Sequence, residues 1–192
     1  AKVVALCNHR TIQGNDRIQV IRGSMSDPDT ITEALSGVTH VVHMAAVKES
    51  PDLVIDVSIK AMFLLLEGAR KSSTFQQFIL IGGDCSVGHV FYDYPAPIAE
   101  TAPRRAYPGC YALTKVIEEV MLEQYSIQYG LNQCCLRAPW IMEKDDFKCA
   151  LSFGADQFGG PAWDDLINEV SLARYRKGGF VPVMQDLSLL HL

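Results

Sequence analysis

The chain has 192 residues, of which 48% are hydrophobic and 20% charged, and its formal net charge is −5. This length and composition predict one folded core with a small appendage. The negative charge and the absence of a Lys/Arg-rich run argue against nucleic acid as the main partner. No apolar run approaches the length of a membrane-spanning helix, about 20 residues, so we expect no membrane partner.

The six cysteines do not form a pattern typical of disulfides or metal sites. No C-x-x-C pair occurs, and the neighbours Cys134 and Cys135 would point to opposite faces of a strand. The first residues read as a strand and not as a secretion signal. We therefore expect reduced thiols, no bound metal and a cytoplasmic protein.

Short β-branched segments alternate with helical patterns along the chain. Strands are predicted at 2–6, 18–21, 39–44, 75–81 and 131–136, and helices at 27–37, 53–71 and 109–129. The strands are apolar without strict polar alternation, which is typical of a parallel sheet covered on both faces. The order predicts an α/β fold with a doubly wound parallel sheet and right-handed crossovers. After Pro139 the pattern weakens, so we expect a first domain at 1–142 and a partial substrate-binding region at 143–192.

Tyr111 and Lys115 are the leading candidates for chemistry. They lie four residues apart at the start of the third predicted helix, and therefore on the same helical face. A lysine ammonium in this position can lower the pKa of the phenol, as proton transfer by a tyrosine requires. The alternative is an aromatic and a cation on a solvated helix.

Four further segments accompany this pair in order: His43-Met44-Ala45-Ala46, the helix with 56–59 and 65–70, the turn 107–111, and Leu136-Arg137-Ala138-Pro139. Together they resemble the extended short-chain dehydrogenase/reductases, the NAD-dependent epimerases and dehydratases that act on sugars. The resemblance runs from about residue 2 to 142. It implies a Rossmann-like sheet, with NAD or NADP as cofactor and a small-molecule substrate, for example a nucleotide sugar. Arg10, near the end of the first predicted strand, is a hint towards NADP.

The resemblance also implies roles for individual residues. Tyr111 would be the general acid/base, and Lys115 would lower its pKa and hold the nicotinamide ribose. The cofactor would further contact Ala45 and Ala46, Ser58, Ser24 and Met25 over the adenine, and Pro139 to Ile141 beside the nicotinamide. The helices at 53–71 and 109–129 would form a four-helix interface in a homodimer.

Two features depart from the family. Gly83 stands where a catalytic Ser or Thr is expected; Ser86 lies three residues later and could serve if the loop bends differently, and Asp84 or Cys85 could substitute. The G-x-x-G-x-x-G loop of the first βα unit does not occur, so residues 1–6 correspond to the family's second strand. Because the first strand is central, we expect a gap in the sheet, either because the sequence is a fragment, which we favour, or because the sheet is rearranged. The alternative function is a catalytically impaired dinucleotide-binding or scaffold relative.

Overall fold

The computed structural model describes residues 1–139 except 90 and 96. Within this part, five strands lie within two residues of the predicted bounds: β1 (Val3–Cys7), β2 (Ile18–Arg22), β3 (His40–His43), β4 (Gln77–Gly83) and β5 (Gln133–Ala138). The predicted substrate-binding region at 143–192 and the predicted contact of Ile141 lie outside the described residues.

The first helix, α1 (Pro28–Ala34), begins as its sequence predicts. The carboxylate of Asp27 accepts hydrogen bonds from the backbone amides of Asp29 at 3.3 Å and Thr30 at 3.2 Å. Pro28 occupies the first helical turn, where its missing N–H costs no hydrogen bond. The helix therefore starts at a local signal that needs no tertiary contact.

The second predicted helix is one continuous helical run with an irregular middle. It comprises α2 (Pro51–Val54), the π-helical turn η1 (Ile55–Lys60) and α3 (Ala61–Lys71). The third, α4 (Cys110–Tyr129), ends at Gly130, whose φ of 66° is a conformation that glycine adopts without steric cost.

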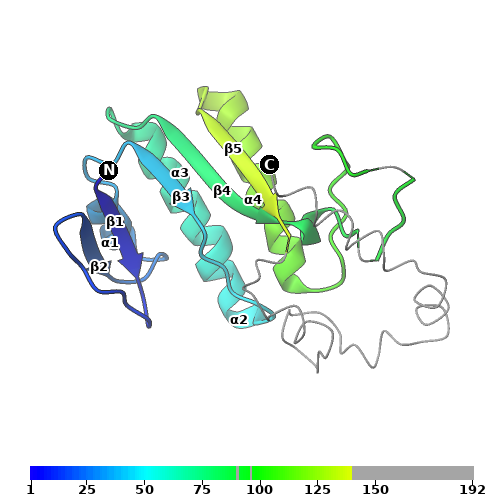
Figure 1. Ribbon diagram of the computed structural model, residues 1–192, viewed down its shortest axis with the longest axis horizontal. Helices are drawn as coiled ribbons and strands as arrows, with labels where there is room; N and C mark the ends of the chain where they lie inside the picture. The colour runs from blue at the N-terminus through cyan, green and yellow to red at the C-terminus, as the bar shows by residue number, and fades with distance from the viewer. Residues whose placement is uncertain (90, 96, 140–192) are drawn as a thin grey trace.

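The strands form two separate parallel sheets. β1 pairs with β2, and β3, β4 and β5 pair in that order, while no strand hydrogen bonds join β1 to β3 in the described part of the chain. Figure 1 shows β1 and β3 running in the same general direction with no strand between them. The predicted α/β fold with a parallel Rossmann-like sheet is confirmed, and the expected gap in the sheet lies between β1 and β3.

The described helices cover one face of the sheets, with α3 and α4 behind β3, β4 and β5 in Figure 1. The core on this side contains Phe78 and Leu80 of β4, packed with apolar residues of α3 and α4. On the other face, Val42 of β3 and Leu136 of β5 are 50% and 53% exposed. Within the described residues the apolar strands are thus covered on one side, whereas their composition predicts cover on both.

Candidate active site

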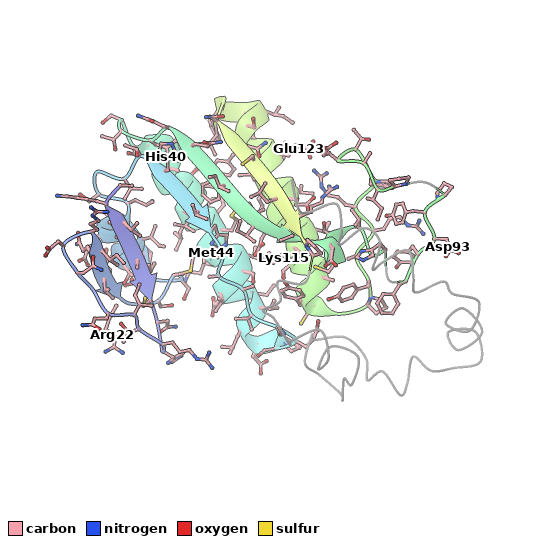
Figure 2. All side chains as sticks on the ribbon, in the orientation of Figure 1. Arg22, His40, Met44, Asp93, Lys115 and Glu123 are labelled. Carbon is pink, nitrogen blue, oxygen red and sulfur yellow. The ribbon has the colours of Figure 1, made fainter. Side chains whose placement is uncertain are left out.

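Several predicted site residues follow the carboxyl ends of parallel strands. Ser24 and Met25 follow β2, Ala45 and Ala46 follow β3, and Pro139 follows β5. In α/β sheets ligands bind beyond these carboxyl ends. Figure 2 shows Met44 at the end of β3 and Lys115 toward the same edge, with His40 at the opposite end of β3.

A carboxylate from another part of the chain holds the start of α4. Glu49, in the segment after β3, accepts hydrogen bonds from the backbone N–H groups of Cys110 at 2.8 Å and Tyr111 at 3.2 Å. The Cys110 thiol donates to the same carboxylate at 3.1 Å. Gly109 precedes the helix with φ 137°, a conformation that other residues rarely adopt. Sequence reasoning missed Glu49, since its partners lie 61 and 62 residues away.

Lys115 is buried, which rules out the alternative of a cation on a solvated helix. Its side chain is 3% exposed. The Nζ atom donates to Glu118 Oε2 at 2.9 Å and to the backbone carbonyl of Ile81 at 3.3 Å. It lies 5.9 Å from the centroid of the Tyr111 ring. The helix thus places the ammonium beside the phenol, one turn away.

Tyr111 lies in a poorly solvated environment beside β4 and the short 3₁₀ turn η2 (Asp84–Ser86). Burial raises its pKa above the ordinary value, and the neighbouring ionisable groups Cys85, Asp84 and Glu118 add to the rise. The phenol is therefore protonated and neutral near neutral pH.

Gly83 occupies the position where a hydroxyl is expected, and the geometry agrees with that alignment. A Cβ atom at this position would lie 3.8 Å from the Tyr111 oxygen. It would also lie 2.8 Å from the sulfur of Cys85, so the thiol already fills part of the space for a side chain. Burial raises the pKa of Cys85 to about 12, with Asp84 contributing, so this thiol is protonated.

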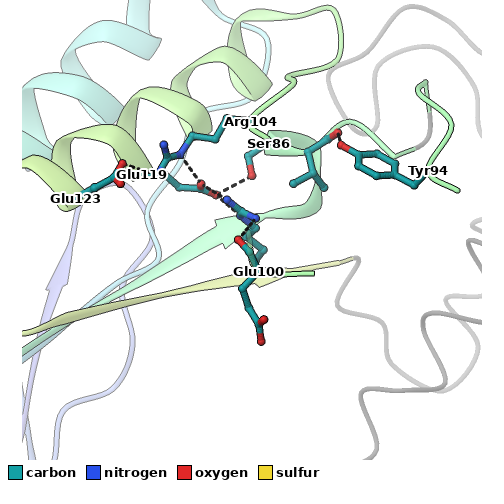
Figure 3. A network of polar contacts seen from close by, with 8 residues as sticks. Ser86, Tyr94, Glu100, Arg104, Glu119 and Glu123 are labelled. Atoms are coloured by element: carbon teal, nitrogen blue, oxygen red, sulfur yellow. Dashed lines mark hydrogen bonds and ion pairs between the residues drawn. The ribbon is translucent and has the colours of Figure 1, made fainter. Parts of the chain in front are cut away.

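The hydroxyl of Ser86 faces a different group. It donates to Glu119 Oε1 at 2.7 Å inside a network that also contains Arg104 and Arg137, shown in Figure 3. The Nη2 atom of Arg137 donates to Glu119 Oε2 at 2.9 Å. This network joins η2 and β5 to α4 through charge-assisted hydrogen bonds.

Two buried polar side chains near the carboxyl edge have no hydrogen-bond partner among the described residues: both ring nitrogens of His43 and the hydroxyl of Ser58. Burial and the charge of Lys115 lower the pKa of His43 to about 4, so the ring is neutral. Because an unpartnered buried polar group is costly, Ser58 is suited to a ligand contact. By contrast, the hydroxyl of Ser24 lies 2.8 Å from that of Ser26, and Met25 packs against the core.

The cysteines, the helix lengths and the grouping of acidic, His and Cys side chains can be described for the same part of the chain. Cys7, Cys85, Cys110, Cys134 and Cys135 are free thiols. None of the helices described there has the length and apolar character to cross a membrane. Among the same residues, no group of three or more His, Cys, Asp or Glu side chains could hold a metal ion.

The fold is similar to several solved structures. The UDP-glucose 4-epimerase of Thermotoga maritima, solved with UDP-glucose, is 22% identical with a TM-score of 0.62; the match covers 71% of this chain and 47% of that one. The UDP-glucose 4-epimerase of Thermus thermophilus, solved with NAD, is 24% identical with a TM-score of 0.61, covering 70% and 46%. The glucuronic acid dehydrogenase of Chromohalobacter salexigens is 16% identical with a TM-score of 0.67, covering 82% and 64%.

These identities establish the fold alone, and the chain spans about half the length of the first structures that it matches. Comparison with curated protein sequences gives no significant match. The family comparison matches residues 2–142, from β1 to beyond β5 and including Tyr111 and Lys115. The chain therefore belongs to the NAD dependent epimerase/dehydratase family.

Proposed function

We propose that this chain forms the nicotinamide half of the active site of an NAD- or NADP-dependent enzyme that oxidises, epimerises or dehydrates a sugar or related hydroxyl-bearing substrate, such as a nucleotide sugar. The observation that carries the proposal is the buried Lys115 ammonium, 5.9 Å from the ring of Tyr111. Solved structures of the same fold with NAD or UDP-glucose support it.

In this proposal Tyr111 takes the hydroxyl proton of the substrate and Lys115 favours the phenolate form during transfer. The dinucleotide, when bound, supplies the hydride acceptor. Lys115, Ser58 and the segment with Ala45 and Ala46 would hold it, together with Pro139. The unpartnered hydroxyl of Ser58 and the small side chains of the two alanines fit such a ligand.

Ser24 and Met25 would lie near the adenine. Ser86 would have a structural role. Its hydroxyl is committed to Glu119, so we assign it to holding η2 against α4 and not to the substrate.

The proposal is tested by comparing Tyr111→Phe with Tyr129→Phe, a tyrosine on the same helix that is exposed. Turnover of a panel of nucleotide sugars and uronic acids, followed by NADH or NADPH formation and by product analysis, should collapse in Tyr111→Phe and survive in the control. Affinity for the dinucleotide, measured by thermal shift, should survive in both. Unchanged turnover in Tyr111→Phe would refute the mechanism.

A catalytically impaired dinucleotide-binding or scaffold relative is the second candidate, favoured by the absence of a side chain at Gly83. It predicts that NAD or NADP stabilises the protein while no substrate of the panel turns over. Lack of stabilisation by either dinucleotide would count against both candidates.

We further propose a homodimer through α4 and the run from α2 to α3. Apolar side chains on these helices are exposed, namely Leu53, Ile55, Phe63, Leu113, Val120 and Ile127. Phe63 lies 6.3 Å from Tyr125 between ring centroids, so α3 and α4 present a joint surface. Light scattering should show a dimer that Leu113→Glu converts to a monomer; a monomeric wild type would reject this interface.

A further inference from the structure

The ammonium of Lys115 is paired with a carboxylate of its own helix. Glu118 Oε2 lies 2.9 Å from Lys115 Nζ, and the two side chains are 0% and 3% exposed. The second carboxylate oxygen, Oε1, has no hydrogen-bond partner among the described residues. This is a buried ion pair in which one carboxylate oxygen lacks a hydrogen bond. Such a pair lowers the stability of the fold unless other interactions offset the cost of burying the charges.

Lys115 lies one turn and Glu118 two turns from Tyr111 along α4, so the charges of the pair bear on how readily the phenol ionises. A positive charge near a tyrosine favours the phenolate, and a negative charge opposes it. Lys115 supplies the first and Glu118 the second. Burial is the largest cause that raises the pKa of Tyr111, and the negative charge of Glu118 is the smallest of those that add to it.

We propose that Glu118 is a positioning residue of this site: it fixes the Lys115 ammonium at the Ile81 carbonyl and offsets the charge by which Lys115 assists Tyr111. The role of Tyr111 as acid/base rests on the proposed function, whereas the electrostatic coupling of the three side chains stands independently of it. The consequence is a phenol that keeps its proton until the balance between Lys115 and Glu118 changes.

Other ionisable groups face the same region from each neighbouring element. They are Asp84 and Cys85 of η2, Tyr107 before α4, Glu49 after β3, and His43 of β3 beside Lys115.

These groups do not replace Glu118 in its role. His43 and Cys85 are neutral near neutral pH, because burial lowers the pKa of His43 to about 4 and raises that of Cys85 to about 12. Asp84 lies 3.6 Å from His89, and Glu49 is bound to the backbone at the start of α4. Glu118 is the carboxylate in direct contact with Lys115 in the described part of the chain.

A purely structural ion pair makes a different prediction. Its loss would lower the stability of the fold but leave the ionisation of Tyr111 unmoved. The two explanations are therefore separated by the titration of one phenol and not by stability.

The experiment follows the ring-carbon NMR signal of labelled tyrosine in the protein without dinucleotide, across the alkaline range in which circular dichroism shows an intact fold. Tyr111→Phe assigns the signal. In Glu118→Gln, which keeps an oxygen for Lys115 but removes the charge, ionisation of Tyr111 should move to lower pH, because a negative charge that opposes the phenolate is lost. Glu123→Gln, on the exposed side of the same helix, should leave it unchanged.

Two further variants keep the inference testable if Glu118→Gln does not fold. Lys115→Met leaves the carboxylate alone and should move ionisation to higher pH. Lys115→Met/Glu118→Gln removes both charges and should return it close to the wild-type value. Two results would overturn the inference. One is a folded Glu118→Gln variant in which Tyr111 ionises at the same pH as in the wild type. The other is a double variant in which Tyr111 ionises at the same pH as in Lys115→Met.

Thermal shift with NAD on the same proteins separates this inference from the proposed function. A shifted Tyr111 titration without stabilisation by NAD would reject dinucleotide binding and support the electrostatic role of Glu118. Stabilisation by NAD with an unmoved titration would reject the role of Glu118 alone.

Discussion

A side chain at position 83 is expected to destabilise the protein unless Cys85 is shortened. The Cβ atom of Gly83→Ala would lie 2.8 Å from the Cys85 sulfur, about 1 Å closer than a favourable contact. Overpacking of this kind costs about 1–3 kcal/mol. Cys85 is buried with 3% exposure, so its sulfur has little room to turn away.

Removal of the sulfur should relieve this cost. Cys85→Ala alone is expected to cost about 1 kcal/mol, since it empties a small buried volume. Because the sulfur that the new Cβ atom meets is then absent, Gly83→Ala/Cys85→Ala should lose no more stability than Cys85→Ala does. The coupling energy would then be about 1–3 kcal/mol, well above the roughly 0.5 kcal/mol scatter of independent sites.

Urea and thermal unfolding of the four proteins measures this cycle, and each kcal/mol should change the melting temperature by about 2–4 °C. Additive losses would show that Cys85 does not occupy the space at position 83. The same cycle with Gly83→Ser tests the site: its hydroxyl would lie near the Tyr111 oxygen, 3.8 Å from the Cβ position. Gly83→Ser/Cys85→Ala should raise turnover above Gly83→Ala/Cys85→Ala if a hydroxyl there supports catalysis.

Three other predictions follow from the contacts of the site. Glu49→Gln should destabilise the protein by about 1 kcal/mol in urea unfolding, because a charged acceptor is lost at the start of α4; an unchanged midpoint would contradict this. Burial alone would raise the pKa of Glu119. Hydrogen bonds to its carboxylate, of which the one from Arg137 is the strongest, outweigh burial and lower the pKa below 4.5. The stabilisation by Glu119 should thus be complete above pH 4.5 and should be lost as the pH falls through the lower pKa of the folded state. The free energy of unfolding of Glu119→Gln should therefore approach that of the wild type in acid. A difference between the two proteins that stays constant with pH would contradict this prediction. Cys85 should resist thiol reagents in the native state and react after unfolding, as peptide mass mapping would show; rapid native labelling would contradict its burial.

The helices and strands were predictable because their signals are local. Asp27 and Pro28 mark the start of α1, and Gly130 marks the end of α4, through contacts within one or two turns. The π-helical turn η1 could not be predicted, since helical periodicity does not distinguish it from the α-helices on either side. The apolar strands predicted helices on both faces of the sheet, whereas the described helices cover one face.

The adjacency of the candidate pair was predictable from the sequence, whereas the side chains that surround the pair were less so. Tyr111 and Lys115 share a helical face because of their spacing, which any α-helix would enforce. The sequence left Ser86, Asp84 and Cys85 as alternatives for the missing hydroxyl. Only the fold distinguishes them: Ser86 faces Glu119, and Cys85 lies against position 83.

By itself the sequence determined the order of the elements, the parallel α/β fold, the family and the adjacency of Tyr111 and Lys115, because periodicity, capping and motif spacing are properties of neighbouring residues. Tertiary structure decided what surrounds that pair. It brought Glu49 to the start of α4, buried Lys115 with Glu118, and left β1 and β3 in separate sheets. Burial and hydrogen bonding between distant segments depend on how the chain packs, and these are the interactions that set the ionisation of a buried tyrosine.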